Sequence, residues 1–534
     1  MELADYIIIG SGCTGAIAAE TLCNSGKLVV MIDTGIESDY ENTSNTDFIT
    51  KRLEDSNQSD YFLGEKLEVL QENANPNIPQ ITPQRSYINS LTEKFLPVKT
   101  VDFFPVESLA LGGLGNSWGL GSYTFSAAEI KKCGLDEQEM NQAYAWVAKK
   151  IGISGVQQDD AAVFCHNNII ELQNTIQLNP AASDLYNRYK KHRGAINKKQ
   201  LYMGRPSLAI ITEDKDHRKA YSYNDTDFYD NPGDSTFRPP ILIHQLIQQG
   251  KLEYKPGWLV RSFVENDQGI EVKCQHIKTD AHHSFFAKKL IIAASTLSTS
   301  RIVLRSMNPS AELPVLCNAY TYMPMVYLPY LGKQHTGPLC GLAQLAMFYD
   351  INQDQSEIAM ASVYNYRSLL NFRILKQMPL NFADGGKFLQ LLLPSLFIAG
   401  IFHPASYQQG NHIRLTSATT KVGDILETNY TYAGSELNRI NETEKQYSNA
   451  FFKLNCFVLK KLRTATGGSI HYAGALPFSE REEPLRLAPD GRLYGTKNVY
   501  VADGSGFTYL PGKGLTLSLM ANAHIVAKNI QSHA

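Results

Sequence analysis

The chain has 534 residues, of which 43% are hydrophobic and 19% are charged, and its formal net charge at pH 7 is -2. This length predicts two or three structural units rather than one small core. The balanced charge, with no basic cluster, excludes nucleic acid as an expected partner.

Eight cysteines are spread along the chain, and none forms a close CxxC pair. The spacing fits neither a zinc site nor a disulfide framework, so we expect no metal and reduced thiols in a cytoplasmic protein. No signal peptide is expected at the N-terminus, and no apolar run reaches the roughly 18 residues of a membrane span. The nearest candidate, 388–402, predicts a buried helix followed by a strand; peripheral membrane contact is the less favoured alternative.

The most informative segment lies at the N-terminus. The apolar run 6–9 predicts a buried parallel strand, and Gly10-Ser11-Gly12-Cys13-Thr14-Gly15 follows it directly. A small-residue helix over 16–23 and a second strand over 27–32 come next, and that strand ends at Asp33. This order of strand, glycine turn, helix, strand and acid predicts a dinucleotide site.

Each glycine of this turn has a physical reason. Gly10 permits the tight turn, Gly12 lets the backbone approach a pyrophosphate, and Gly15 lets the helix pack closely on the strand. The helix N-terminus then offers N–H groups to the phosphates, and Asp33 is placed to accept hydrogen bonds from a ribose. The motif alone does not separate FAD from NAD.

The middle of the chain predicts a mixed architecture. Residues 37–101 are polar and predict a loop-rich excursion, and five glycines in 109–121 predict a second cofactor contact. Further patterns predict the following elements: helices over 126–199, 241–248 and 299–306; strands over 252–254, 258–264, 269–274 and 290–295; and an antiparallel sheet from 313–330 and 344–348.

The C-terminus predicts the other half of the cofactor site. Residues 498–505 predict a strand ending in Asp503 and Gly504, and a turn at 511–514 leads into a helix over 515–530. A helix N-terminus beside an acid suits a flavin-facing site. Upstream, His471 lies between glycine turns that keep its surroundings open, which favours a functional role over a structural one.

These residues together resemble the glucose–methanol–choline (GMC) oxidoreductases. The N-terminal glycine turn resembles the family's FAD fingerprint, and 111–118 is similar to its second glycine motif. Residues 289–301 and 499–523 are similar to its later strand–helix segment and its C-terminal signature. The resemblance is strong at both ends and weak over 40–100 and 310–467.

The resemblance implies an α/β fold: a Rossmann-like FAD-binding domain of the GMC and p-hydroxybenzoate hydroxylase kind, with an α+β substrate domain built on an antiparallel sheet. We expect residues 1–38, 100–125, 205–310 and 465–534 to form a discontinuous FAD-binding domain. Residues 39–99 and 126–204 would form loop or helical excursions and a lid, and 311–464 the substrate-binding domain.

The resemblance also implies a site. His471 falls at the position of the family's catalytic base, which takes the hydroxyl proton while a hydride passes to flavin N5. Tyr472 and His403 are candidate substrate contacts. The expected FAD contacts are Gly10, Gly12, Cys13, Thr14, Gly15, Asp33, Gly112, Gly113, Asn116, Ser117, Trp118, Val260, Ala294, Asp503, Gly504, Gly514, Leu515 and Thr516.

Three departures from the family pattern matter. Gly514 stands where the family usually has a second active-site Asn or His, and the adjacent Lys513 differs in chemistry. Ser295 replaces a usual glycine. The second glycine motif has no histidine that could attach to the flavin, which favours non-covalent FAD.

The leading hypothesis is FAD-dependent oxidation of an alcohol of a sugar or secondary metabolite. Without the Asn or His, a flavin-dependent desaturation, cyclisation or redox-neutral conversion in natural-product biosynthesis is an alternative, and a catalytically silent flavin-binding protein is another. NAD-dependent oxidation is a weaker hypothesis, because it does not explain the Asp503 segment. The electron acceptor stays open among oxygen, a quinone and a protein.

Overall fold

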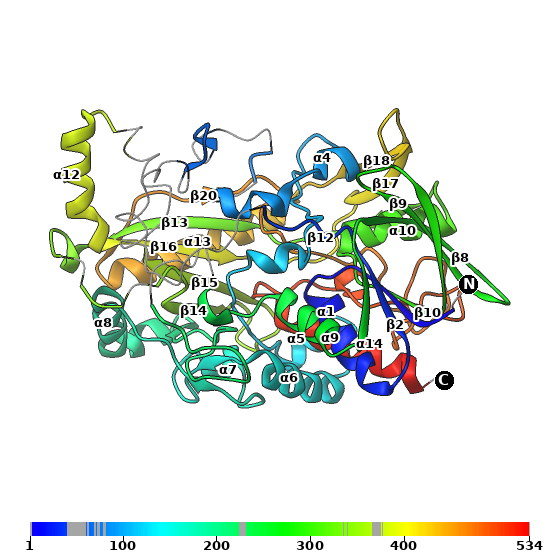
Figure 1. The fold of residues 1–534 in the computed structure, drawn as a ribbon. Helices are drawn as coiled ribbons and strands as arrows, with labels where there is room; N and C mark the ends of the chain where they lie inside the picture. Colours follow the sequence, from blue (N-terminus) through cyan, green and yellow to red (C-terminus); the bar gives the residue numbers. More distant parts are fainter. Residues whose placement is uncertain are drawn as a thin grey trace.

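The structure is a computed structural model, and it describes residues 3–39, 60, 63–68, 71, 75–77, 82–223, 231–334, 336–338, 340–365, 375 and 378–532. Its two largest sheets lie at opposite ends of an elongated molecule (Figure 1). Most of the predicted excursion 39–99 falls outside the described residues.

The first sheet has a parallel centre drawn from three distant segments. Its parallel strands lie in the order β7 (Leu252–Lys255), β2 (Val29–Ile32), β1 (Ala4–Ile9), β10 (His282–Ile292) and β22 (Val499–Val501). β9 (Gly269–His276) and β8 (Trp258–Asn266) extend the sheet in antiparallel fashion from the first half of β10. The two ends of the chain therefore meet beside β10.

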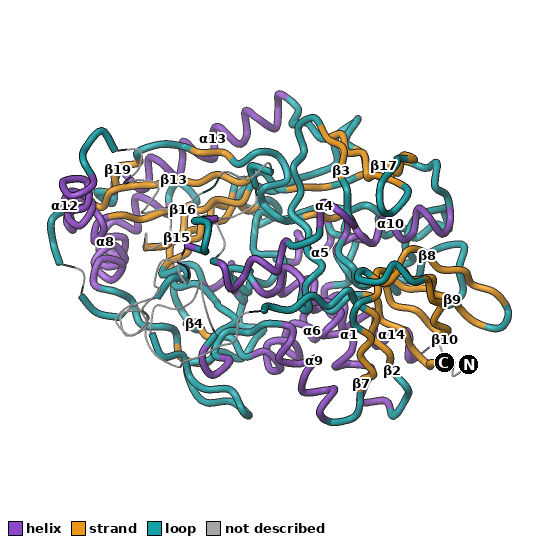
Figure 2. Tube along the Cα trace, turned by 45° about the horizontal axis from the view of Figure 1, so that its top comes forward, coloured by secondary structure: helices purple, strands orange, loops and turns teal. Residues whose placement is uncertain are grey.

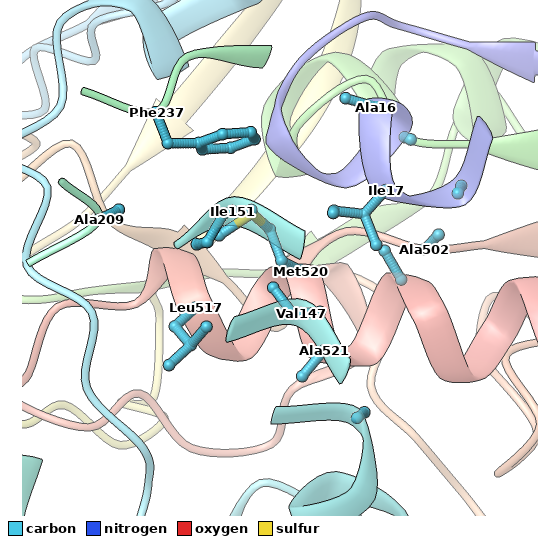
Figure 3. Packing of buried hydrophobic residues seen from close by; sticks show 14 of the residues in the cluster. Ala16, Ile17, Val147, Ile151, Ala209, Phe237, Ala502, Leu517, Met520 and Ala521 are labelled. Carbon is cyan, nitrogen blue, oxygen red and sulfur yellow. The ribbon is translucent and has the colours of Figure 1, made fainter. Parts of the chain in front are cut away.

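Helices cover both faces of this sheet because β1 is apolar on both sides. Ile8 packs in one cluster with α1 (Cys13–Leu22), α6 (Glu137–Ile151), α9 (Pro239–Gln248) and α14 (Thr516–Ser532). Figure 3 shows Ile17, Val147 and Met520, which come from three of these helices and belong to this cluster. On the other face, Ile7 packs with α10 (Thr296–Met307).

The second large sheet is antiparallel. Its order is β19 (Cys456–Val458), β13 (Tyr320–Tyr327), β16 (Leu396–Phe402), β15 (Ile358–Asn365), β14 (Leu345–Asp350) and β6 (Leu201–Gly204), and β20 (Leu462–Arg463) also pairs with β13. The helices α8 (Pro180–Asn197) and α13 (Gly434–Lys453) pack on one face. Tyr447 of α13 fixes that contact by donating to the carbonyl oxygens of Met347 and Ala359, at 3.1 and 2.8 Å. The predicted fold class is confirmed.

Smaller elements complete the molecule. A third sheet runs β11 (Glu312–Pro314), β17 (His412–Ser417), β18 (Asp424–Asn429) and β3 (Val98–Thr100). β12 (Leu316–Cys317) pairs with β21 (Tyr472–Ala473), and β4 (Ser154–Gly155) with β5 (Gln173–Asn174). The remaining α-helices of the described chain are α4 (Thr92–Phe95), α5 (Ala127–Lys132), α7 (Ala162–Cys165) and α12 (Phe382–Leu392).

The segment 388–402 corrects one prediction. A helix is followed by a strand there, as expected: α12 precedes β16. The helix is not buried, however, because Phe388 and Leu391 keep 48% and 53% of their surface exposed. Among the helices described, none combines the length and apolarity that crossing a membrane would require. The boundaries proposed for the domains stay a prediction, and β6 of the segment 126–204 joins the second sheet.

Candidate active site and cofactor cavity

A cavity runs from the edge of the first sheet to the face of the second. Its walls include the glycine turn after β1, the second glycine motif and the start of α14. Of the predicted cofactor contacts, the following lie on the cavity wall: Gly10, Gly12, Cys13, Thr14, Asp33, Gly113, Ser117, Trp118, Val260, Ala294, Asp503, Gly504, Gly514, Leu515 and Thr516. Segments more than 400 residues apart in sequence thus meet at one surface.

The first glycine turn has the geometry of a phosphate site. Gly10 has φ +95°, and a Cβ there would lie 2.7 Å from the carbonyl oxygen of Ala293. Gly15 packs against the Gly10 carbonyl, off the cavity wall. A Cβ on Gly12 would meet no protein atom within 4 Å, so the space beside it belongs to the cavity. No side chain caps α1, which leaves its first amides available to an anion.

Asp33 ends β2 at the cavity wall. It accepts hydrogen bonds from Ser11 Oγ and, at 3.2 Å, from Tyr254 Oη. Burial raises the pKa of its carboxyl from 3.8 to about 7, against the opposing effect of these hydrogen bonds. A buried carboxylate with few charges nearby suits hydroxyl donors such as those of a ribose.

The second glycine motif is tied to the first. The amide of Gly112 donates to Ser11 Oγ at 2.9 Å, and Gly112 itself has φ +86°. Asn116 does not reach the cavity: its Nδ2 donates to the Leu111 carbonyl oxygen at 2.6 Å and shapes the loop from behind. Trp118 lies on the wall, held by its Nε1 donating to the Phe237 carbonyl oxygen at 3.0 Å.

Asp503 holds the C-terminal half of the cavity together. One carboxyl oxygen accepts from the backbone N–H of Ser505 at 2.9 Å and from its hydroxyl, and the other accepts from Thr299 Oγ1. Burial raises the pKa of Asp503 above its ordinary value. Asp503 therefore connects the end of β22 to α10. The start of α14 also lies on the cavity wall.

His471 stands at the opposite end of the cavity, against the second sheet. Its ring is stacked on Phe402 of β16, with centroids 4.3 Å apart and planes at 8°. Its Nδ1 lies 3.0 Å from Oδ1 of Asn318. Burial lowers the pKa of the imidazole from 6.5 to about 4, so the ring is neutral at pH 7.

Asn318 decides which tautomer His471 adopts. The Nδ2 of Asn318 donates to the carbonyl oxygens of His403 and Pro511, at 2.7 and 3.2 Å. Those carbonyls only accept, so the amide nitrogen must face them and the amide oxygen must face His471. His471 Nδ1 therefore carries the proton, and Nε2 holds a free lone pair. A neutral imidazole with an accepting Nε2 is what a general base requires.

Comparisons with known proteins concern part of the sequence and the fold. Residues 405–523 match the family model described as GMC oxidoreductase. This segment is thus similar to the GMC oxidoreductases. The crystal structure of pyridoxine 4-oxidase from Mesorbium loti is similar over 99% of this chain and 100% of that chain, with a TM-score of 0.57 and 11% identity, and that likeness concerns the fold. No curated protein matches the sequence.

The structure places the two predicted substrate contacts differently. His403 is absent from the cavity wall; its Nε2 lies 3.1 Å from Thr321 Oγ1, and burial lowers its pKa to about 3. Tyr472 reaches the wall, but its hydroxyl donates to the Gly467 carbonyl at 2.7 Å and accepts from the Val106 amide at 2.9 Å. The hydroxyl of Tyr472 is thus occupied by backbone partners, and His403 lies outside the cavity wall.

The surroundings of Gly514 leave no room for the Asn or His that the resemblance implies at this position. A Cβ there would lie 2.8 Å from the Gly121 carbonyl oxygen and 3.0 Å from the ring of Tyr123. Lys513 does not supply a polar group to the cavity: its Nζ pairs with Glu129 at 2.9 Å, and both side chains are buried. The cavity wall at Gly514 therefore offers backbone and aromatic surface rather than a polar side chain.

The end of the cavity formed by the second sheet was the part that the sequence predicted least. Alternate residues of three adjacent strands face it: Tyr320 and Tyr322 of β13, Met360, Ser362 and Tyr364 of β15, and Phe402 of β16. Tyr320, Tyr322 and Phe402 face the cavity, whereas Tyr327, Phe348 and Phe397 of the same sheet lie in cores. The period of two along β13 and β15 is the signal that could have found Tyr364 and Ser362.

Proposed function

We propose that this protein binds FAD non-covalently and oxidises an alcohol, with His471 Nε2 accepting the hydroxyl proton. The observation that carries the proposal is the fixed tautomer of His471. Its neutral ring faces the cavity whose other end bears the glycine turn and Asp33. The GMC family implies an oxidoreductase with FAD; the donor and the residue roles are our proposal.

The residues present fit FAD. The space at Gly12 and the uncapped start of α1 would receive the pyrophosphate, and Asp33 would accept from the ribose. The second glycine motif and the start of α14 would hold the flavin ring. When bound, FAD supplies the hydride acceptor.

The chain's own residues prepare the proton transfer. Phe402 sets the plane of His471, and Asn318 sets its rotation and its tautomer. The substrate hydroxyl donates to Nε2, and the proton moves there as the carbinol carbon is oxidised. The closed aromatic surroundings keep the imidazole neutral before the step, because burial disfavours its charged form.

The lining of the substrate end favours a neutral, ring-bearing or apolar alcohol. The charged side chains found on the cavity wall, Asp33, Glu107, Arg301, Arg305 and Asp503, lie with the first sheet and its helices. Glu107 and Arg301 neutralise each other in a buried pair at 2.6 Å. A charged substrate would therefore find no partner beside His471 among the described wall residues, and burying an unpaired charge is costly.

The test is anaerobic reduction of the FAD-loaded protein by matched alcohols, followed at the oxidised-flavin absorbance. We expect neutral aromatic or alicyclic alcohols to bleach the flavin, and their carboxylate or ammonium analogues to fail. Bleaching by charged analogues alone would contradict the substrate class. A flavin that no alcohol reduces would contradict the oxidation itself.

The surroundings of Gly514 favour one second candidate. Because no second polar side chain stands there, a desaturation, cyclisation or redox-neutral conversion that needs one base is compatible with the site. Conversion of a substrate without net flavin reduction, abolished in His471→Ala, would support it over alcohol oxidation.

A further inference from the structure

Large apolar side chains gather on the solvent surface at the far end of the second sheet. They are between 40% and 73% exposed, although most large apolar side chains of the molecule are buried. We call this surface the α12 face. Its members come from α12, from the turn after β13 and from the edge strands β19 and β20: Phe382, Phe388, Leu391, Leu328, Leu331, Phe457, Leu459 and Leu462.

These residues form one surface because three segments are joined at β13. Phe457 pairs with Val326 and Leu462 with Tyr322, so they project to the side of the sheet that carries Tyr322. On that side Val326 packs against Leu389 of α12. The Gly332 amide donates to the Leu391 carbonyl at 3.0 Å, which ties the turn after β13 to α12. Figures 1 and 2 both place α12 at this end of the sheet.

The α12 face carries positive charge among its apolar side chains. Lys460 and Lys461 stand between Leu459 and Leu462, and both are exposed. Neither has a carboxylate partner within the described part of the chain. Further exposed lysines lie on or beside the contributing elements: Lys333 and Lys387. Asp384, 3.9 Å from Lys387, is an acid on the same helix.

An ordinary edge strand accounts for only part of this pattern. Lysines on an edge strand discourage pairing with another chain, which would explain Lys460 and Lys461 alone. It does not explain two exposed phenylalanines on α12, which a helix over a water-facing surface would replace by polar residues. Apolar side chains interleaved with lysines are instead the pattern of surfaces that rest in a membrane interface.

The α12 face also borders the cavity. Tyr322 lines the cavity, and 41% of its surface is exposed. Leu462 is its cross-strand neighbour on the surface. A partner that covers the α12 face would therefore lie next to the His471 end of the cavity.

We propose that the α12 face docks on an anionic lipid bilayer. The apolar side chains enter the boundary between headgroups and acyl chains, and the lysines face anionic headgroups. Docking places the His471 end of the cavity next to the membrane surface, where an apolar substrate is concentrated. The docking itself does not depend on the proposed reaction.

The test is flotation of the full-length protein with vesicles of phosphatidylcholine alone or with added phosphatidylglycerol, at low and high salt. We expect binding to the anionic vesicles at low salt and its loss at high salt. The double variant Lys460→Glu/Lys461→Glu should lower the partition coefficient about tenfold or more, because each lysine near an anionic surface contributes to attraction.

Matched controls show whether the effects on vesicle binding are specific to the α12 face, rather than due to any change of charge or apolar surface. Lys198→Glu/Lys199→Glu makes the same charge change at exposed lysines before β6, on the opposite edge of the same sheet, and should bind like the wild type. Leu391→Ser should weaken binding, whereas Ile247→Ser, on the exposed side of α9, should not. Circular dichroism verifies that each variant is folded.

Three results would overturn the proposal. One is an absence of binding to anionic vesicles at low salt. Another is equal loss of binding in the two lysine double variants. The third is a dimer in solution that Leu391→Ser converts to a monomer, which would show that a second copy covers the face instead.

Discussion

The side-chain oxygen of Asn318 lies 3.0 Å from Nδ1 of His471, and its nitrogen is held by the His403 carbonyl at 2.7 Å. In the proposed reaction Asn318 is a positioning residue: it would touch no reacting atom but leaves Nε2 of His471 as the acceptor. Because it is anchored at both ends of its amide, its effect can be tested separately from that of His471.

Replacing Asn318 by Ala should slow flavin reduction by roughly tenfold or more at saturating alcohol, because the tautomer and ring rotation are no longer fixed. Asn318→Asp keeps an acceptor for the Nδ1 proton, but its second oxygen would face the carbonyls that Nδ2 now satisfies, so it should restore the rate only in part. A rate in Asn318→Ala equal to that of the wild type would contradict a positioning role for Asn318.

The wild-type pH profile follows from the buried imidazole. Burial lowers the pKa of His471 to about 4, so its free base is present at neutral pH and is lost only as pH falls through about 4. The rate of flavin reduction should stay level from pH 7 to about 5 and decline below that. A solvent-exposed histidine would instead give a decline near 6.5. Stopped-flow reduction across this range, with flavin retention checked at each pH, measures it.

Removing the base is the direct test of its role. His471→Ala should keep the yellow flavin spectrum and lose substrate-dependent bleaching by roughly 10² or more. His403→Gln provides a matched control, since His403 is buried nearby but absent from the cavity wall. It should change the rate by less than about threefold once stability is accounted for. Undiminished reduction in His471→Ala would remove that residue from the mechanism.

Gly12 allows cofactor binding and folding to be separated. A Cβ there meets no protein atom, so Gly12→Val should fold normally yet lose FAD, because the side chain would occupy the pyrophosphate space. Gly194→Ala, another site with open space, should keep FAD and gain up to about 1 kcal/mol of stability within α8. Absorbance at constant protein concentration gives the occupancy. Full occupancy in Gly12→Val would mean that the turn does not hold the cofactor.

Local patterns predicted the parts of the site whose residues are neighbours in sequence. The glycine turn, Asp33 and the Asp503 segment lie on the cavity because strand order fixes where strand ends meet. Asn318 could not be predicted, because it lies 153 residues from His471 and the pairing of β12 with β21 brings the two together. The chemistry of His403 was suitable for a substrate contact, but its side chain faces Thr321 and is absent from the cavity wall.

Lys513 carries an amine that could act on a substrate, but its side chain is buried in an ion pair. It is adjacent to Gly514, yet its Nζ faces Glu129 and the Thr124 carbonyl, away from the cavity. Lys513→Met should lower the free energy of unfolding by about 3 to 5 kcal/mol, because it leaves the Glu129 carboxylate buried without an opposite charge.

The double variant Lys513→Met/Glu129→Leu should recover much of that loss, since no unpaired charge remains. The rate of flavin reduction per bound FAD should stay close to that of the wild type in both variants. Chemical denaturation and single-turnover reduction measure the two quantities independently. A rate that falls steeply while stability is restored would mean that the Lys513 ammonium acts on the substrate. The conclusion that no polar side chain acts at or beside Gly514 would then be wrong.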